Sequence, residues 1–204
     1  MAGSEVGTAG NNPKGAFARD LDRYLVLMAD RRTISKVRLA VYTPGLWIMA
    51  LYRLGNRLCR AADKNRLLKL VSIPYGFLYF LLGVVTGIYI PLETDIGPGL
   101  YIGHWGGIMV HPKTVIGENC NLSQGVTIGE GGRAGNRGVP RIGDRVYIAP
   151  GAKVFGDIVI GNDVAIGANA VVNKSVPDKA VVGGIPAAVI SMDGSADFVI
   201  LSDD

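Results

Sequence analysis

His104 and His111 are the two histidines of this 204-residue chain, and they are its side chains best suited to acid–base chemistry near neutral pH. An unperturbed imidazole has a pKa of about 6.5, so it can remove the proton of a hydroxyl group while that hydroxyl attacks another molecule. Two histidines exclude any metal site that needs three of them. Cys59 and Cys120 lie far apart without metal-type spacing, and no signal peptide is recognised, so we expect free thiols in a reducing, cytoplasmic setting.

The element that must position these side chains is visible as a six-residue repeat. Neither an α-helix nor an alternating strand has this period, whereas a triangular coil with three six-residue sides does, with its aliphatic residues pointing inward. The pattern predicts a mainly β fold, a parallel β-helix over residues 88–191. The aliphatic positions in phase are Ile90, Ile96, Ile102, Ile108, Ile116, Leu122, Ile128, Ile142, Ile148, Val154, Ile160, Ile166 and Val172.

Two breaks interrupt this repeat. Two residues are added between Ile108 and Ile116, and eight are added between Ile128 and Ile142, which expels a polar, glycine-rich loop at residues 130–139. Such an excursion from a rigid scaffold is a common place for function, although a tolerated insertion gives the same pattern. His104 lies outside the inward-pointing positions, so we do not expect it to pack in the core.

The N-terminal third carries the basic excess. Residues 1–70 have a net charge of +8 and residues 71–204 one of −4, which suits an anionic partner. We expect a disordered tail at 1–18, a C-terminal tail at 192–204, and a helical region at 19–87 that packs on its own domain, on a partner subunit or on a membrane surface. Nucleic acid is not expected, because the basic residues are interleaved with a strongly apolar region.

Two helices are expected within this region. Pro44 should begin the first, which has an apolar stripe of Trp47, Leu51, Leu54 and Leu58 beside a basic stripe of Arg53, Arg57 and Arg60. The second falls in a stretch without charge between Lys69 and Glu93. We expect Pro74 and Gly76 to break its front end, which leaves a helix of about 14 residues or about 21 Å, shorter than the ~30 Å of a hydrocarbon core. A buried or membrane-surface helix is therefore preferred to a transmembrane span.

The chain resembles the hexapeptide-repeat acyltransferases, and within them the serine acetyltransferase branch, over roughly residues 88–190. The motifs that carry the resemblance are IGPGLYIGHWGGIMVH, NLSQGVTIGEGG, PRIGDRVYIAPGAKVFGDIVIGNDVAIGANAVV and VVGGIPAAVI. The resemblance implies left-handed coiling and a homotrimer with active sites between neighbouring β-helices. It further implies acetyl-CoA as co-substrate, no metal, and His104 as the catalytic base.

Residue by residue, the resemblance implies a coenzyme A groove between adjacent coils and an acceptor site beside His104. The acceptor-binding residues would be His111, Trp105 and Tyr89. Small residues would let the pantetheine arm lie against the backbone, and cations would bind the phosphates. The small residues are Gly129, Gly131, Pro150, Gly151 and Ala168, with residues 184–186 at the far end, and the cations are Arg133, Arg137, Arg141, Arg145 and Lys153.

Three positions depart from the serine acetyltransferase pattern. The aspartate before the catalytic histidine is Gly103 here, the second active-site histidine is Val139, and the carboxylate that orients the catalytic histidine is Tyr89. Loss of a charge-matched contact weakens recognition of a zwitterionic acceptor. The segment GHWGGIMVHP with an apolar N-terminal helix also resembles enzymes of surface-polysaccharide assembly.

We therefore predict an O-acetyltransferase that moves an acetyl group from acetyl-CoA to a sugar hydroxyl. The acceptor would ride on a lipid carrier, and the enzyme would be peripheral at the inner membrane face. The alternatives are a serine O-acetyltransferase of cysteine biosynthesis and a non-catalytic β-helix that serves as a scaffold subunit.

Overall fold

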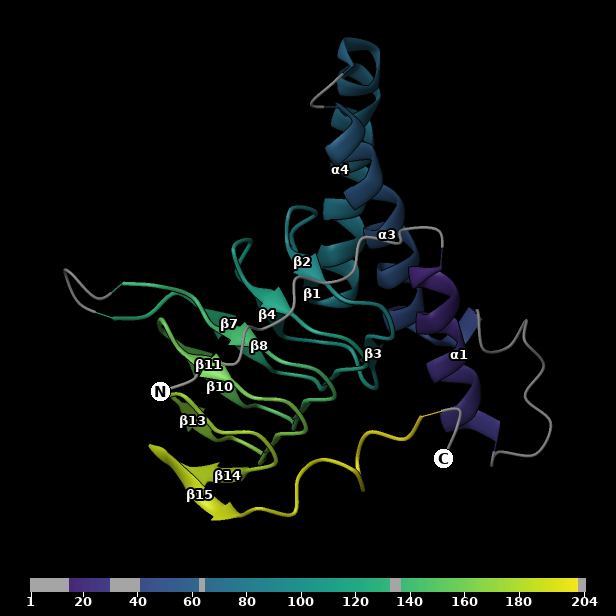
Figure 1. Ribbon diagram of the computed structural model, residues 1–204. Helices are drawn as coiled ribbons and strands as arrows, with labels where there is room; N and C mark the ends of the chain where they lie inside the picture. The colour runs from purple at the N-terminus through teal and green to yellow at the C-terminus, as the bar shows by residue number, and fades with distance from the viewer. Residues whose placement is uncertain (1–14, 30–40, 63–64, 133–136, 202–204) are drawn as a thin grey trace.

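The structure, a computed structural model, describes residues 15–29, 41–62, 65–132 and 137–201. Helices α1 (Ala16–Ala29), α3 (Pro44–Ala62) and α4 (Arg66–Thr86) stand at one end of a β-helix whose coils lead away from them to β15 (Figure 1). The strands are β1 (Ile88–Tyr89), β2 (Asp95–Ile96), β3 (Tyr101–Ile102), β4 (Ile108–Val110), β5 (Val115–Ile116), β6 (Asn121–Leu122), β7 (Thr127–Gly129), β8 (Arg141–Ile142), β9 (Tyr147–Ile148), β10 (Lys153–Phe155), β11 (Val159–Ile160), β12 (Ala165–Ile166), β13 (Val171–Val172), β14 (Val181–Gly184) and β15 (Ala187–Ser191).

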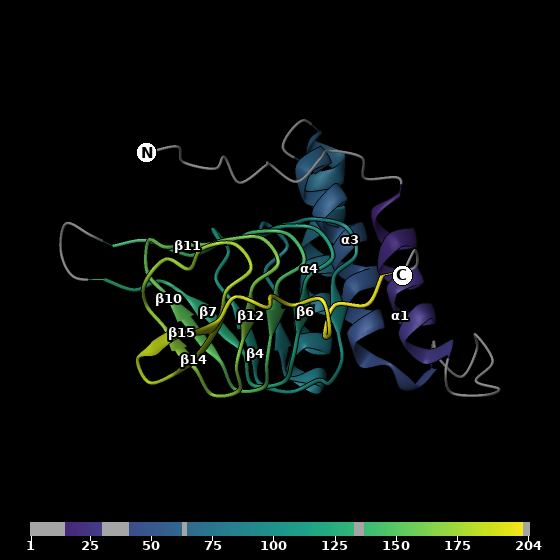
Figure 2. The ribbon, with the colours of Figure 1, turned by 60° about the horizontal axis from the view of Figure 1, so that its bottom comes forward.

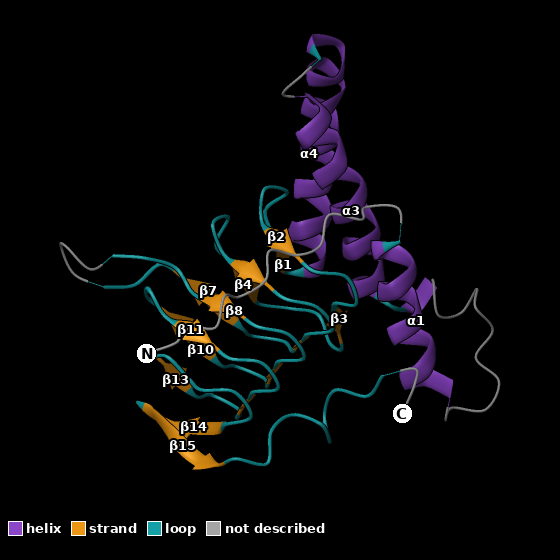
Figure 3. Ribbon diagram, in the orientation of Figure 1, coloured by secondary structure: helices purple, strands orange, loops and turns teal. Residues whose placement is uncertain are grey.

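From β1 to β14, consecutive strands join different sheets, so the chain winds through three walls (Figure 2). We call them sheet A (β1-β4-β7-β10-β13), sheet B (β2-β5-β8-β11) and sheet C (β3-β6-β9-β12-β14-β15). The ladders are parallel apart from β14–β15, which is antiparallel. Figure 3 shows the short strands joined by turns at the corners of this prism.

The repeat predicts the core correctly. Each of the thirteen aliphatic positions is buried, with none more than 4% exposed. They stack in columns from coil to coil, as in Leu122 against Ile148 in sheet C and Ile116 against Ile142 in sheet B. The six-residue period therefore describes one continuous aliphatic core inside the three walls.

The first break in the repeat lies elsewhere than predicted. Val110, and not Ile108, is in register with Ile128 of the next coil. Ile108 pairs with Ile88 and is equally buried, because each side of the prism has a second inward-pointing position. The two extra residues therefore fall between Ile102 and Val110, in the corner that contains His104, and not after Ile108.

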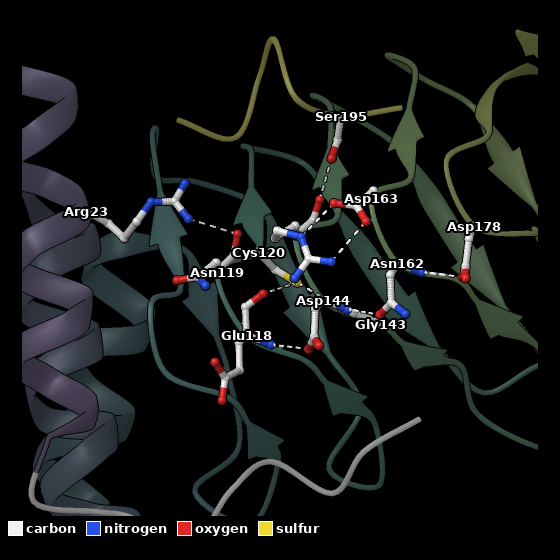
Figure 4. A network of polar contacts seen from close by, with 11 residues as sticks. Arg23, Glu118, Asn119, Cys120, Gly143, Asp144, Asn162, Asp163, Asp178 and Ser195 are labelled. Atoms are coloured by element: carbon white, nitrogen blue, oxygen red, sulfur yellow. Dashed lines mark hydrogen bonds and ion pairs between the residues drawn. The ribbon is translucent and has the colours of Figure 1, made fainter. Parts of the chain in front are cut away.

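The edge between sheets B and C is held by a ladder of side-chain caps (Figure 4). Asp144 accepts a hydrogen bond from the Glu118 amide at 2.8 Å, Asn162 accepts one from the Asp144 amide, and Asp178 accepts one from the Asn162 amide, both also at 2.8 Å. Cys120 lies in the core beside this edge, and burial raises the pKa of its thiol to about 12. Cys59 and Cys120 are not joined by a disulfide bond in this structure.

Helices α1 and α3 close the N-terminal end of the β-helix with a buried ion pair. Arg53 binds Asp20 through Nε and Nη2 at 2.8 and 3.0 Å, and it also donates to the carbonyls of Ile96 and Gly97. Oδ1 of Asp20, which accepts Nη2 of Arg53, also accepts the amides of Gly99 and Leu100. These backbone groups belong to the first coil, which has no preceding coil to pair with, so the two helices satisfy them.

This arrangement corrects the predicted faces of α3. The helix begins at Pro44 as predicted, but Trp47 and Leu54 of the expected apolar stripe are exposed and Arg53 of the expected basic stripe is buried. The face against the β-helix is instead Ile48, Met49 and Tyr52. An arginine can occupy such a buried face because a carboxylate and two backbone carbonyls accept hydrogen bonds from its guanidinium group.

Helix α4 is longer than predicted. It runs unbroken through Pro74 and Gly76 for 21 residues, from the N-cap Asn65 to the left-handed Gly87. Tyr75 and Tyr79 fix it to its neighbours, since their hydroxyls donate to the carbonyls of Leu51 and Ile90. This packing compensates for the local cost of a proline inside a helix, about 3 kcal/mol.

Parts of both expected tails have an ordered structure in the described residues. Helix α1 begins at Ala16, inside the stretch expected as a tail. Residues 192–201 run back along sheet C toward α1 (Figure 2). Phe198 stacks on Tyr147 at 4.6 Å, and its carbonyl accepts a hydrogen bond from Asn121 at 2.8 Å. This segment therefore ties several coils together.

Candidate active site

His104 stands on a glycine-rich corner between β3 and β4, where the chain passes from sheet C to sheet A. Gly106 and Gly107 have φ of +103° and +67°, which lets the two extra residues turn outward. The corner packs closely on the next coil, since a Cβ added at Gly107 would lie 3.3 Å from the Cα of Gly125. His104 and Trp105 are exposed on this bulge. Among the described residues, none forms a hydrogen bond or an ion pair with the His104 side chain.

The corners of successive coils stack below His104 and form one edge of the prism, which we call the C/A edge. The Gly125 amide donates to the carbonyl of Gly106 at 2.8 Å, and the Gly151 amide donates to that of Gln124 at 2.9 Å. The Asn169 amide continues this ladder to Pro150 at 2.9 Å. The same edge as His104 therefore holds Pro150, Gly151 and Ala168. The predicted coenzyme A groove needs such small residues on one edge along the coils.

Lys153 lies beside this edge on the outer face of sheet A. Its ammonium donates to the carbonyl of Gly125 and to Oγ1 of Thr127, the latter at 3.1 Å. The lysine is half-buried and lies along the wall. Its charge is thus held close to the edge that carries His104.

The remaining coenzyme A candidates lie across sheet A, on the edge where the chain passes to sheet B. Gly129 ends β7, Gly131 forms a two-hydrogen-bond bridge with Gly138 at the base of the expelled loop, and Arg141 is exposed at the start of β8. Arg133 lies outside the described residues. Within one chain the predicted groove is therefore divided between two edges.

Two other arginines from the expected cluster are engaged in ion pairs. Arg145 binds Asp163 at 2.6 Å on the edge between sheets B and C, which is a different edge of the prism from the one that carries the expelled loop. Asp163 holds the pKa of Arg145 above its usual range through this hydrogen bond. Arg137 pairs with Glu130 at 3.1 Å across the base of the loop, where both side chains are largely exposed.

The acceptor-binding candidates are also separated. Trp105 adjoins His104, and Tyr89 is exposed on the outer face of sheet A opposite Met109. His111 is at the other end of β4 from His104, at the A/B edge, where its Nδ1 accepts a hydrogen bond from the amide of Lys113 at 3.2 Å. The two histidines of one chain thus stand at opposite ends of one strand.

Tyr101 is a neighbour of the site that the sequence reading did not identify. A Cβ added at Gly103 would lie 3.1 Å from Cε1 and 3.6 Å from the hydroxyl oxygen of Tyr101. The ring also contacts Tyr24 of α1, with centroids 4.7 Å apart. The alternation of a strand puts Tyr101 and Gly103 on one face, and this spacing was the available signal.

No three His, Cys, Asp or Glu side chains come together as a metal site within the part of the chain that the structure describes.

Comparisons with known proteins agree with this architecture. Residues 140–174 match the family described as bacterial transferase hexapeptide (six repeats). A serine acetyltransferase of Staphylococcus aureus is 45% identical over 109 residues, 53% of this chain and 51% of that protein. One of Mycobacterium tuberculosis is 44% identical over 107 residues, 52% and 47% of the two chains. This chain thus spans about half the length of the curated relatives it matches.

Solved structures resemble a larger part of the chain. A Neisseria gonorrhoeae serine acetyltransferase in complex with serine has a TM-score of 0.71 and 26% identity, covering 90% of this chain and 71% of that one. A serine acetyltransferase in complex with CoA has a TM-score of 0.70 and 26% identity, covering 89% and 71%.

The fold and the repeat define the class of structure: a left-handed parallel β-helix of hexapeptide repeats with a helical region before it. Within that fold, the chain is similar to serine acetyltransferases, over about half of its length in sequence and over about nine-tenths of its length in structure.

Proposed function

We propose that this chain is an acetyl-CoA-dependent O-acetyltransferase with His104 as its general base. The observation that carries the proposal is the exposed histidine on a two-residue bulge, at the head of an edge that also holds Pro150, Gly151 and Ala168. The likeness to a serine acetyltransferase solved with CoA supports coenzyme A as the carrier.

The proposed reaction needs one general base and hydrogen-bond donors that stabilise the oxyanion. His104 takes the proton of the acceptor hydroxyl as its oxygen attacks the thioester carbon, and backbone amides stabilise the tetrahedral oxyanion. Collapse of that intermediate breaks the carbon–sulfur bond, and the proton held by His104 passes to the departing thiolate. The products are an acetyl ester and free coenzyme A.

The division of the groove between two edges of sheet A favours a homotrimer. The C/A edge of one copy would face the A/B edge of the next, so that His104, Pro150 and Gly151 of one chain meet Gly129, Gly131 and Arg141 of its neighbour. Each site would then contain one copy of His104 and the neighbour's copy of His111.

L-serine is the acceptor that the comparisons support best, because the relatives quoted above carry serine acetyltransferase as their name and one was solved with serine. A carbohydrate hydroxyl is the second candidate. The observation that favours it is the absence of a side chain at Gly103, where the Tyr101 ring covers the strand instead. The Tyr101 hydroxyl near this position can donate and accept hydrogen bonds with a hydroxyl acceptor, and it brings no negative charge to pair with the ammonium group of an amino acid.

Release of free thiol from acetyl-CoA tests the proposal. We expect turnover that requires a hydroxyl acceptor, and serine and nucleotide-linked or lipid-linked sugars should be compared at equal concentration. Robust turnover of serine alone would exclude the sugar. A lack of thiol release with every acceptor, combined with the loss of a biological function when the gene product is absent, would instead favour a scaffold subunit.

Substitution of Gly103 tests whether a negative charge at this position determines which acceptor the protein prefers. If the chain uses a neutral acceptor, Gly103→Asp should raise kcat/KM for serine relative to the sugar by about tenfold or more, since hydrogen bonds to charged groups contribute about 1.5–3 kcal/mol. Gly103→Asn is the matched control, because it crowds Tyr101 equally and brings no charge. Equal effects of Asp and Asn would show that crowding against Tyr101, and not charge, changes the selectivity.

A further inference from the structure

Helix α4 exposes an apolar surface along its whole length. Its buried residues are Tyr79 and Thr86, on the side that packs against α3 and the first coil. The outer side carries large apolar residues that are between 43% and 79% exposed: Leu67, Leu70, Val71, Ile73, Phe77, Leu78, Phe80, Leu81, Val84 and Val85. A helix that is apolar on all sides is stable where protein or hydrocarbon surrounds it, and this chain covers only one side.

The dimensions of α4 match a hydrocarbon layer. Its 21 residues extend about 31 Å, with a mean hydropathy of 1.8 over 18 residues, and it is the helix among the described residues that is long and apolar enough to cross a membrane. Crossing is opposed by its surroundings. The adjacent α3 carries Asn56 and Arg60, which bind Leu92 and Asp95 of the first coil, so a span would draw charged side chains and the β-helix into the bilayer.

The charges of the helix pair are placed at one end. Arg57 and Arg60 lie on the last turns of α3, and Arg66 and Lys69 lie on the first turn of α4. Figure 1 shows that α3 ends and α4 begins where the helix pair stands farthest from the β-helix. Arg57, Arg66 and Lys69 therefore lie toward that end, whereas Arg60 pairs with Asp95 of the first coil. Such a cationic end beside an apolar face complements anionic headgroups above hydrocarbon.

A groove continues this surface toward His104. It has a volume of about 570 Å³ and lies between α4 and sheet A. Its walls include Phe80 and Val84 of α4, Pro91, and Met109 of the strand that follows the His104 corner. Hydrocarbon that contacts α4 would therefore meet an apolar path that ends on the strand beside the proposed catalytic base.

We propose that the outer face of α4 and this groove form a lipid-binding surface that holds the protein on an anionic bilayer without crossing it. The apolar side chains enter the hydrocarbon, Arg57, Arg66 and Lys69 contact headgroups, and the β-helix stays in water. The inference does not depend on the acetyl transfer proposed above.

Vesicle flotation of the full chain tests this surface. We expect the protein to float with vesicles of phosphatidylcholine and phosphatidylglycerol, and to float less with phosphatidylcholine alone or at high salt. The triple variant Ile73→Gln, Phe77→Gln, Val84→Gln should lose at least about tenfold in lipid partitioning, since each buried apolar side chain contributes about 1.5–3 kcal/mol. These positions are exposed, so the fold should survive the change.

A matched control and a second readout keep the outcomes distinct. The control is the triple variant Val189→Gln, Ile190→Gln, Met192→Gln, which alters three exposed apolar residues in β15 and directly after it. This variant should float like the unaltered protein. Equal flotation of the α4 variant would overturn the proposal. Failure of the unaltered protein to bind either vesicle, with a smaller assembly for the α4 variant in analytical ultracentrifugation, would also overturn it and assign the face to a second copy of this chain. Thiol release with a soluble acceptor should be the same in all three proteins.

Discussion

Replacement of His104 by alanine is expected to lower kcat for acetyl transfer by at least ~100-fold, because general bases of this kind contribute about 10²–10⁴-fold. The fold should be unaffected. The side chain is exposed on an outward bulge, and no described residue forms a hydrogen bond or ion pair with it. Loss of activity in this variant would therefore report on chemistry and not on unfolding.

The other histidine provides the matched control for this experiment. His111→Ala removes the same type of side chain from the opposite end of β4, where its Nδ1 accepts the amide of Lys113. We expect a smaller loss there, seen mainly in KM for the acceptor, if His111 contributes to a neighbour's acceptor site. Thiol release gives kcat and KM, and circular dichroism and thermal unfolding check the fold. Unchanged kcat for His104→Ala would remove His104 from the mechanism.

The repeat made the core and the edges of the fold predictable from the sequence, because a six-residue period fixes both which residues point inward and where corners fall. The period could not locate the first insertion. Ile108 and Val110 are both aliphatic and both buried, so residue type alone does not tell which of them continues the column to Ile128. Only the register of β4 against β7 shows that the two extra residues lie in the corner that contains His104.

The parts of the site that the sequence reading missed depend on contacts between distant or alternating residues. Tyr101 is two places from Gly103, and its relevance appears only once both are seen on one strand face. Pro74 carries a local signal that ends a helix, but packing of Tyr75 and Tyr79 on α3 and the first coil outweighs it. Helical spacing placed Arg53 on a surface stripe, because its partner Asp20 belongs to another helix.

Replacement of Arg53 by methionine is expected to lower the free energy of unfolding by about 3–5 kcal/mol, the usual effect of removing one partner of a buried ion pair. The change leaves the carboxylate of Asp20 buried and removes the donor to the carbonyls of Ile96 and Gly97. Arg57→Met is the control, since Arg57 is exposed one turn further along the same helix. Urea unfolding at fixed protein concentration measures both, and a loss below about 1 kcal/mol for Arg53→Met would show that the first coil needs no such cap.

The pH dependence of the stability of Arg53→Met tests whether the uncompensated charge of Asp20 causes the destabilisation. Burial raises the pKa of Asp20 above its ordinary value even with Arg53 beside it, and loss of the guanidinium removes the main influence that lowers it. A carboxyl group whose pKa is raised in the folded state favours folding below its unfolded pKa of about 4, and this contribution is lost as the pH rises through the folded pKa. Arg53→Met should therefore be more strongly destabilised at pH 8 than at pH 5. The double variant Asp20→Asn, Arg53→Met has no carboxyl group to ionise there, so its deficit should not grow with pH. If both variants lose stability equally at the two pH values, the missing hydrogen bonds to the first coil, and not the uncompensated charge, account for the effect.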